Sequence, residues 1–567
     1  MVFSASTYAN FVSEKPASQT RLFKTYEGSR DDFDVIIVGS GVGGGILADD
    51  LAERIGKHKR ILVLEAGSYL YPTHIYNVCR FPNSSVARHF ACKTFRQSGN
   101  EGTEDYIHEQ PQLNFGGRSI WWSGLIPHIQ PWELDFFPER VRRDLENKLL
   151  NRAGAIMNES SSMGTVAQQI VNKFRQSSLV DDFIIEETPR ALHQPYLDQS
   201  GIPKQDFYTE PTGVFNTAEL LINQVGLTPG VSWDDGPGLH LLLNNFVEGV
   251  EQINDGPLRY RVTSTDTINH IPRSFRAKTV ILAGGSIESP KLLHRSPVFN
   301  TLSPGVQSLV GVGLTDHPTT HELNSFITHM GNDLAIPPTA HAKIILYSRG
   351  HRVPDTNEIR YPFNVEININ HEYWHLRDND PTERASSSGG GGGNSRIDFK
   401  FSFANPIYGG NRIDLSSSNY VPNMHFRNLS WASHLADSRF PALAGWNKSI
   451  DQIWAVLNSV SHKIFSQFTF HGQPARPEGE KWFGKHGKGF GMGTVHHAAG
   501  SLRMPFRWTG RHEFAEESVV DEDLQVRGLE GLYVCDMSVM PLSSAANPVR
   551  TLVGLGLRLG ERLGGLV

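Results

Sequence analysis

Cysteine is scarce in this chain, which holds only three among 567 residues: Cys79, Cys92 and Cys535. Three scattered cysteines argue against a disulfide framework and against a cysteine-based metal site. No apolar run reaches the roughly 18 residues that a membrane-spanning helix requires. The formal net charge of −6 gives no basic surface for nucleic acid. A disulfide-stapled, a membrane-spanning and a nucleic-acid-binding protein are therefore all disfavoured.

The N-terminal segment 1–30 is polar and lacks the apolar region of a secretory signal peptide. Together with the few cysteines, this predicts a reducing, cytoplasmic location. Hydrophobic residues make up 39% of the chain and charged residues 20%, as in ordinary globular proteins. A chain of 567 residues is long enough for a large core and at least two domains.

A glycine-rich turn is the most informative feature that is present. An apolar strand at 34–38 runs into Gly39, Gly41 and Gly44, and a second apolar strand ends on Glu65, about 20 residues further on. In such a turn the first glycine permits a tight bend, the second lets the backbone approach a pyrophosphate, and the third lets the helix pack on the sheet. The helix N-terminus would face the phosphates, and Glu65 would accept hydrogen bonds from ribose hydroxyls. The context predicts a dinucleotide site; the alternative is a glycine-rich turn that binds nothing.

Glycine-rich segments and apolar strands also occur much further along the chain. A second glycine-rich segment occupies 114–124, a strand runs into a glycine turn at 277–286, and 531–536 forms a short buried strand. A last helix follows, with Pro548 at its first position and Asn547 as its cap. Strands of the nucleotide-binding domain are therefore expected at the start, middle and end of the chain.

The segments between them differ in pattern. Residues 140–235 are mixed and expected to be helical in part, whereas the runs 363–369 and 396–403 alternate with period two. This alternation predicts an antiparallel sheet with one face covered. The glycine- and serine-rich stretch 386–395 is a flexible loop, for which a plain exposed insertion is favoured over a lid.

These motifs together resemble the glucose–methanol–choline (GMC) family of flavin-dependent alcohol oxidoreductases. The resemblance covers most of the chain and rests on five places: the turn at 39–44 with Glu65, the segment 116–124, the signature-like 285–293, the V-G-x-x-L-x-D-H pattern at 310–317, and the ordered set from His497 to Pro548. Spacing and the long central insertion are most similar to the pyranose-oxidase branch.

The resemblance implies an α/β fold, in which a Rossmann-like FAD-binding domain is combined with a discontinuous α+β substrate domain built on an antiparallel sheet. The expected parts, in chain order, are an arm at 1–30, FAD-binding segments at 31–140, 236–320 and 489–567, and substrate-domain segments at 141–235 and 321–488.

The resemblance also implies which residues contact FAD. They are Gly39, Gly41, Gly44, Glu65, Gly116, Gly117, Ser119, Ser123, Val247, Asp536, Asn547 and Pro548. Some pyranose-oxidase-like enzymes carry a histidine in the second glycine segment that bonds covalently to the flavin. Here the sequence from Ser119 to Trp122 has no histidine, so non-covalent FAD is expected. Trp121 and Trp122 either pack against the flavin or belong to the core.

Oxidation of an alcohol requires a base for the hydroxyl proton and a hydride acceptor, which flavin N5 provides. Histidine suits the role of base because its pKa lies near neutrality, and the resemblance assigns that role to His497. The neighbouring His496 would point to the opposite face of an extended backbone and is expected to be structural. Asn547 matches the second member of the family's histidine–asparagine pair and would donate a hydrogen bond to the substrate oxygen. The competing interpretation of Asn547 is a simple helix cap.

Other histidines carry less weight. His317 and His321, with Glu322, hint at a metal site, but Pro318 disfavours a helix there and no metal is expected. His371 and His375 fall in the substrate domain, where ordinary surface histidines are the favoured interpretation.

The function predicted from the sequence is FAD-dependent oxidation of a small-molecule alcohol, a sugar or glycoside, to a carbonyl. Oxygen or another acceptor would reoxidise the flavin, and an oxidase is favoured over a dehydrogenase because the layout resembles pyranose oxidase. The alternatives are a lyase or other non-redox enzyme on the same fold, an aryl or aliphatic alcohol dehydrogenase of the family, and a flavin-binding protein without catalysis. The oligomeric state is left open.

Overall fold

The structure is a computed structural model of residues 1–567. It describes residues 31–69, 94–98, 110–160, 164–192, 214–227, 236–317, 319, 324–328, 342–355, 359–369, 395–407, 409–416, 421–425, 450–470, 473–474, 497–506 and 517–566. The predicted arm, His496, the His371–His375 pair and residues 386–394 of the predicted loop lie outside these ranges.

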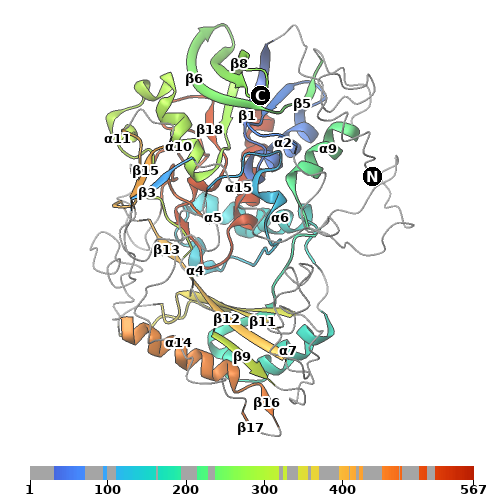
Figure 1. The fold of residues 1–567 in the computed structure, drawn as a ribbon, viewed down its shortest axis with the longest axis vertical. Helices are drawn as coiled ribbons and strands as arrows, with labels where there is room; N and C mark the ends of the chain where they lie inside the picture. Colours follow the sequence, from blue (N-terminus) through green and yellow to red (C-terminus); the bar gives the residue numbers. More distant parts are fainter. Residues whose placement is uncertain are drawn as a thin grey trace.

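A seven-stranded sheet forms the upper part of the molecule in Figure 1, in the order β5-β2-β1-β8-β7-β6 with β18 also paired to β8. The strands are β1 (Asp32–Val38), β2 (Arg60–Leu64), β5 (Gly238–Leu242), β6 (Asn245–Asp255), β7 (Leu258–Asp266), β8 (Pro272–Leu282) and β18 (Leu532–Val534). The strands β5, β2, β1, β8 and β18 run parallel, while β6, β7 and β8 pair antiparallel. The sheet thus draws its strands from the start, middle and end of the chain, as predicted.

Helices α2 (Val42–Ile55) and α15 (Val549–Leu566) pack against each other beside this sheet. The parallel strands read as continuous apolar runs because both of their faces are covered; all of β2 is buried, for example. The other helical elements are η4 (Gly117–Ile120), α4 (Pro131–Leu134), α5 (Glu139–Asp144), η5 (Leu145–Leu149), α6 (Leu150–Ile156), α7 (Thr165–Arg175), α8 (Leu179–Asp182), α9 (Thr217–Leu227), α10 (Gly285–Arg295), η6 (Pro297–Thr301), α11 (Pro304–Gln307), α14 (Ile450–Phe465) and η7 (Met537–Val539).

A second, antiparallel sheet lies at the opposite end of the long axis (Figure 1), in the order β4-β10-β11-β12-β9. Its strands are β4 (Phe183–Glu187), β9 (Asn324–Thr328), β10 (Ala342–Ser348), β11 (Phe363–Ile369) and β12 (Ser395–Phe403). One face carries the apolar side chains of β11 and packs with residues of α7 and α14 in a separate core that includes Phe174, Phe363 and Ile464. The two period-two runs are therefore confirmed as neighbouring antiparallel strands.

Short strands complete the fold: β3 (Arg96–Ser98), β13 (Asn405–Pro406), β14 (Arg412–Asp414), β15 (Asn423–His425), β16 (Thr469–Phe470), β17 (Gln473–Pro474) and β19 (Leu542–Ser543). Within the described ranges, no helix has the length and apolarity needed to cross a bilayer. The residue boundaries predicted for the two domains stay a prediction.

Candidate active site

The turn between β1 and α2 has the shape of a phosphate-binding turn. Gly39 adopts a left-handed φ of +106°. A Cβ on Gly44 would lie 2.1 Å from the carbonyl oxygen of Gly39, so only glycine fits there. By contrast, a Cβ on Gly41 would meet no atom of the protein within 4 Å. Gly44 is therefore needed for packing, whereas Gly41 borders space that a pyrophosphate can fill beside the N-terminus of α2.

The second glycine segment lies directly against this turn. The amide of Gly116 donates to Oγ of Ser40 at 2.9 Å. A Cβ on Gly117 would come within 3.1 Å of Cα of Gly41. Oγ of Ser119 contacts the carbonyl of Gly116 at 2.6 Å, so this hydroxyl stabilises its own turn. The two segments that the sequence assigned to FAD therefore meet, although they are distant along the chain.

Thr217, at the start of α9, also holds this junction and was not predicted. Its hydroxyl donates to the carbonyl of Ser40 at 2.8 Å, and its amide donates to Oγ of Ser119 at 3.0 Å. The signal that locates it is the pair Asn216 and Glu219, whose reciprocal hydrogen bonds resemble a capping box.

Glu65 ends β2 and is buried, with only 5% of its surface exposed. Its carboxylate accepts hydrogen bonds from the amide and hydroxyl of Ser40, at 3.0 and 2.6 Å, and from the amide of Gly67 at 2.9 Å. Burial raises the pKa of Glu65, and these donors oppose that shift. Since a carboxylate has about four acceptor positions, it can bind a ribose hydroxyl as well. Its first role in this structure is to fix Ser40 in the turn.

The remaining predicted FAD contacts have different surroundings. Asp536 follows β18, is buried, and accepts from the amides of Gly285 and Ser538 and from the hydroxyl of Ser289. Val247 is buried in β6. Ser123 is partly exposed in the loop after η4.

The two tryptophans of this region both use their indole N–H groups. Trp121 donates to Oδ1 of Asn114 at 3.3 Å, and Trp122 donates to the carbonyl of Phe215 at 2.8 Å. Both rings pack against the main core while staying partly exposed.

His497 pairs with His317. Their Nδ1 atoms are 3.1 Å apart, and the ring centroids are 5.2 Å apart. Asp316 orients both residues, because its Oδ1 accepts from the amides of His317 at 2.7 Å and of His497 at 3.1 Å. Thr315 and Ala499 exchange two backbone hydrogen bonds, which align the two segments. The V-G-x-x-L-x-D-H segment is therefore part of the site itself.

His317 is held neutral. It is fully buried, and this burial, aided by the positive charge of Lys400, lowers its pKa to about 3. A neutral ring has one N–H, so either ring can in principle donate across the Nδ1–Nδ1 contact. If His497 is to gain a proton at Nε2, its Nδ1–H must donate and Nδ1 of His317 must accept. The contact is compatible with the tautomer in which Nε2 of His497 carries a lone pair.

Asn547 lies in the loop between β19 and α15, and its side chain is free. Its Oδ1 is buried without a hydrogen-bond partner in the described part of the structure. The helix begins at Val549, one residue later than predicted, and its first turn contains a bond from the amide of Leu552 to the carbonyl of Pro548 at 2.9 Å. The prediction that Asn547 caps α15 with its side chain is therefore wrong, because that role requires its oxygen to accept an amide of the first turn.

Backbone contacts bring the histidine and asparagine segments together. Amides of Leu502 and Met504 donate to the carbonyls of η7, and β19 pairs with β13. In β13, Asn405 donates to Oγ1 of Thr315 at 2.9 Å and to the carbonyl of Asp316 at 3.1 Å. Asn405 thus links the strand beside β19 to the segment that carries His317.

The face of the second sheet opposite its apolar core is polar and yet buried. Asn364, Glu366 and Asn368 alternate along β11 on this face and are at most 3% exposed, and Ser402 of β12 is fully buried. Alternation with one covered face predicted that the polar face would meet solvent. That expectation is wrong, because the polar side chains of this face are buried. Thr319 and Trp132 contact the backbone of the same sheet, at Ser402 and Ser348.

Several atoms on this polar face lack partners. In the described ranges, Nδ2 of Asn364, Oδ1 of Asn368 and Oγ of Ser402 are buried without hydrogen bonds. Buried polar groups are normally paired, so three unpaired ones on one face require an explanation.

Glu366 is the charged centre of the same face. Its carboxylate lies 3.1 Å from Nζ of Lys343 and 3.5 Å from Nζ of Lys400. Burial alone would raise the pKa of Glu366, but the two ammonium groups outweigh it and hold the pKa far below its usual range. Burial lowers the pKa of Lys343, and Glu366 opposes that shift. Because both Lys400 and Glu366 influence His317 electrostatically, the charged cluster lies next to the histidine pair.

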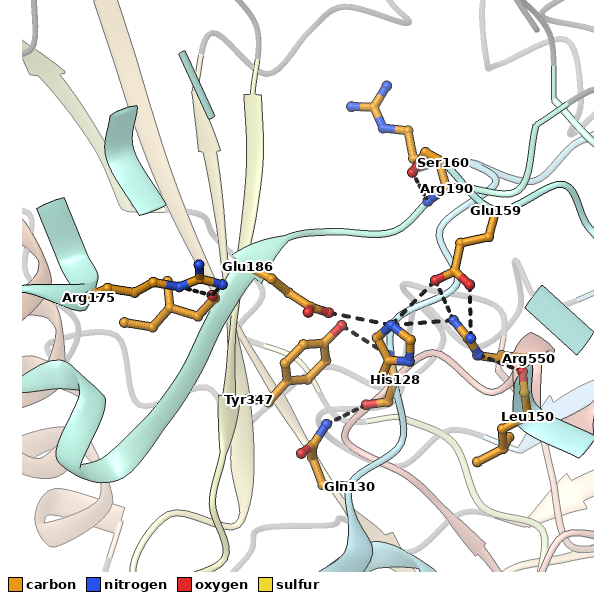
Figure 2. A network of polar contacts seen from close by, with 11 residues as sticks. His128, Gln130, Leu150, Glu159, Ser160, Arg175, Glu186, Arg190, Tyr347 and Arg550 are labelled. Carbon is orange, nitrogen blue, oxygen red and sulfur yellow. Dashed lines mark hydrogen bonds and ion pairs between the residues drawn. The ribbon is translucent and has the colours of Figure 1, made fainter. Parts of the chain in front are cut away.

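A second polar network joins α15 to this sheet (Figure 2). Arg550, which is 2% exposed, makes two hydrogen bonds to Glu159, at 2.6 and 2.9 Å. Nε2 of His128 lies 3.3 Å from Glu159 and 3.7 Å from Glu186 of β4, while its amide donates to the hydroxyl of Tyr347 at 3.0 Å. Burial alone would raise the pKa of Glu159, but His128 and Arg550 lower it to about 2. The first helical turn after Asn547 is thus tied to the substrate-domain sheet.

Metal ligands do not gather here. Over the described ranges, no three histidine, cysteine, aspartate or glutamate side chains lie together in a way that could hold a metal ion. His317 instead faces His497, and His321 and Glu322 lie outside those ranges.

Comparison with known proteins agrees with this fold. Residues 414–556 match the family model described as GMC oxidoreductase. No curated protein matches the chain. Among solved structures, pyridoxine 4-oxidase from Mesorbium loti superposes with a TM-score of 0.59 at 15% identity, covering 94% of this chain and 99% of that one. A formate oxidase variant from Aspergillus oryzae RIB40, solved to show the effect of a mutation on FAD modification, gives 0.56 at 13% identity, covering 95% and 99%.

These likenesses confirm the predicted fold class. Neither superposed protein is a pyranose oxidase, so placement in that branch stays a prediction.

Proposed function

We propose that this chain oxidises an alcohol to a carbonyl with FAD and with His497 as the base, which the match of residues 414–556 to the GMC oxidoreductase family model supports. The observations that carry the proposal are the His497–His317 contact of 3.1 Å and the unpaired Oδ1 of Asn547, whose segments backbone contacts bring together. His497 would supply the base, and the amide of Asn547 would supply a hydrogen-bond donor for the substrate oxygen.

The residues present fit FAD. Gly41 leaves the turn open, because a Cβ on it would meet no protein atom within 4 Å, and the N-terminus of α2 supplies backbone amides for phosphates. FAD, when bound, supplies the acceptor for the hydride that leaves the alcohol carbon. The absence of histidine between Ser119 and Trp122 supports non-covalent binding.

His497 removes the hydroxyl proton at its Nε2. The positive charge that develops on its ring is stabilised through Nδ1–H by the neutral acceptor His317, which Asp316 holds in place. Asn547 donates a hydrogen bond to the substrate oxygen as negative charge develops there. Because His317 stays neutral above pH 3, it adds no positive charge that would oppose protonation of His497.

The polar face of β11 and β12 supports a hydroxyl-rich substrate such as a sugar or glycoside. Its unpaired amide and hydroxyl groups, together with Glu366 and Lys400, are the donors and acceptors that bind sugar hydroxyls. We further propose that oxygen reoxidises the flavin, on the resemblance to oxidases.

The test is an anaerobic titration of the FAD-loaded protein with sugars, glycosides and simple alcohols, followed by air. Bleaching of the flavin band by a sugar is the expected result, with rapid recovery in air. Bleaching only by simple alcohols would refute the sugar assignment, and slow recovery would indicate a dehydrogenase. A yellow protein that no alcohol bleaches would refute the redox proposal and favour the lyase alternative.

A further inference from the structure

Glu133 is a buried carboxylate without a cationic hydrogen-bond partner. It is fully buried in α4, and its Oε2 accepts from the amide of Gln130 at 3.0 Å within the capping box of that short helix. Its Oε1 accepts from the amides of Ala545, closely, and Ala546, at 3.3 Å. Glu133 and Ala546 are 413 residues apart in the chain. All three donors are backbone amides.

Burying such a group is costly. Burial raises the pKa of Glu133 to about 7, and the three amides only partly oppose this. A buried carboxylate without a cationic partner destabilises the fold unless the hydrogen bonds that it accepts offset the cost of its desolvation. An apolar residue at this position would avoid the cost, but it would leave the amides of Ala545 and Ala546 without an acceptor.

Those two amides immediately precede Asn547. On the other side of Asn547, Arg550 is anchored by its paired hydrogen bonds to Glu159 and by a bond from Nε to the carbonyl of Leu150 at 3.1 Å. Asn547 itself makes no side-chain hydrogen bond to the described residues. Its direction is therefore set by its backbone, which is held on one side by Glu133 and on the other by Arg550.

We infer that Glu133 is a positioning residue that fixes the Ala545–Ala546 backbone and thereby aims the amide of Asn547 at the substrate oxygen. This inference rests on the proposed function of Asn547. A displacement of about 1 Å in a positioned group can cost about 100-fold in rate. Loss of the contact should therefore slow the hydride-transfer step more than it weakens substrate binding.

The experiment compares Glu133→Gln, which keeps the shape but removes the charge, with Glu133→Ala, which removes the acceptor. Glu187→Gln is the matched control, because Glu187 also accepts a backbone amide, that of Gly164 at 3.1 Å, but lies outside the site. The FAD-loaded proteins are mixed anaerobically with an alcohol that bleaches the wild type, and the rate constant of flavin reduction and the substrate Kd are measured. Hydrogen exchange of the peptide spanning 542–550 is measured on the same samples without substrate.

The expected result is a fall of about 10-fold in the reduction rate for Glu133→Gln and about 100-fold for Glu133→Ala, with Kd within about 3-fold of the wild type. Exchange across 545–546 should be faster in Glu133→Ala, and the control should match the wild type. In an Asn547→Ala background, Glu133→Gln should slow reduction by less than about 3-fold further, because the group it positions is gone.

An unchanged reduction rate in Glu133→Gln would overturn the inference, as would full additivity with Asn547→Ala. If Glu133→Ala does not fold, the rate of flavin reduction in Glu133→Gln tests the inference instead. If no alcohol reduces even the wild type, the proposed function fails, and unchanged exchange at 545–546 in the Glu133 variants would then overturn the structural part of the inference separately.

Discussion

Replacing Glu366 with glutamine tests whether Glu366, Lys343 and Lys400 form a buried charged cluster on the polar face of the second sheet. The change keeps the side-chain volume but leaves two ammonium groups, Nζ of Lys343 at 3.1 Å and Nζ of Lys400 at 3.5 Å, without their carboxylate. The side chains of the two lysines are only 14% and 18% exposed, so water cannot replace the lost partner. Removing one member of a buried charge cluster typically costs about 3–5 kcal/mol of unfolding free energy. We expect about 3 kcal/mol here, because the amide oxygen of glutamine retains one hydrogen bond.

The pH dependence follows from Lys343, whose pKa burial already lowers. Without Glu366 that pKa falls further, so the folded variant binds fewer protons than the unfolded chain below the usual lysine pKa. The free energy of unfolding of the Glu366→Gln variant then rises with pH up to about 10.4. The difference in unfolding free energy between the variant and the wild type therefore becomes smaller.

Urea unfolding of the apoproteins, followed by tryptophan fluorescence at pH 7 and pH 10, measures both effects. The control is Glu251→Gln, whose exposed ion pair with Arg261 at 2.8 Å should contribute about 0–1 kcal/mol at either pH. A deficit for Glu366→Gln below about 1 kcal/mol, or one that does not change with pH, would refute the buried cluster.

Three further changes test the site. His497→Ala should slow alcohol-dependent flavin reduction by about 100-fold with FAD still bound, as loss of a general base does; stopped-flow absorbance measures this. Asn547→Ala should cost less, about 10-fold, and leave the melting temperature unchanged, because its side chain caps nothing. Gly41→Ala should weaken FAD binding in a fluorescence titration while the apoprotein stays as stable as wild type, whereas Gly44→Ala, with its Cβ 2.1 Å from the carbonyl of Gly39, should destabilise the apoprotein itself.

Local patterns predicted the parts of the fold that depend on local physics. The glycine turn could be located because Gly39 and Gly44 answer local requirements, a positive φ and close packing on the turn. The strands at 363–369 and 396–403 could be predicted because period-two alternation places apolar side chains on one face, which is the face that packs with α7 and α14.

The burial of the other face of that sheet could not be predicted, because nothing local to β11 shows that its polar side chains are covered. The same holds for Glu133, whose partners Ala545 and Ala546 are brought to it only by tertiary packing. His317 was noted as the end of the V-G-x-x-L-x-D-H pattern and for a metal site that the sequence disfavoured, but not as a partner of His497. Its contact with His497 depends on the pairing of Thr315 with Ala499. Asn547 was assigned through the family resemblance, and its free side chain could be recognised only in three dimensions.

The most direct test of alcohol oxidation at His497 is the anaerobic reduction of FAD-loaded wild type and His497→Ala by the same alcohol, with hydrogen or deuterium at the reacting carbon. The wild-type flavin band should bleach, more slowly with deuterium, and the variant should bleach about 100-fold more slowly at equal FAD content. Equal bleaching rates in the two proteins, or a wild-type flavin band that no alcohol changes, would contradict it.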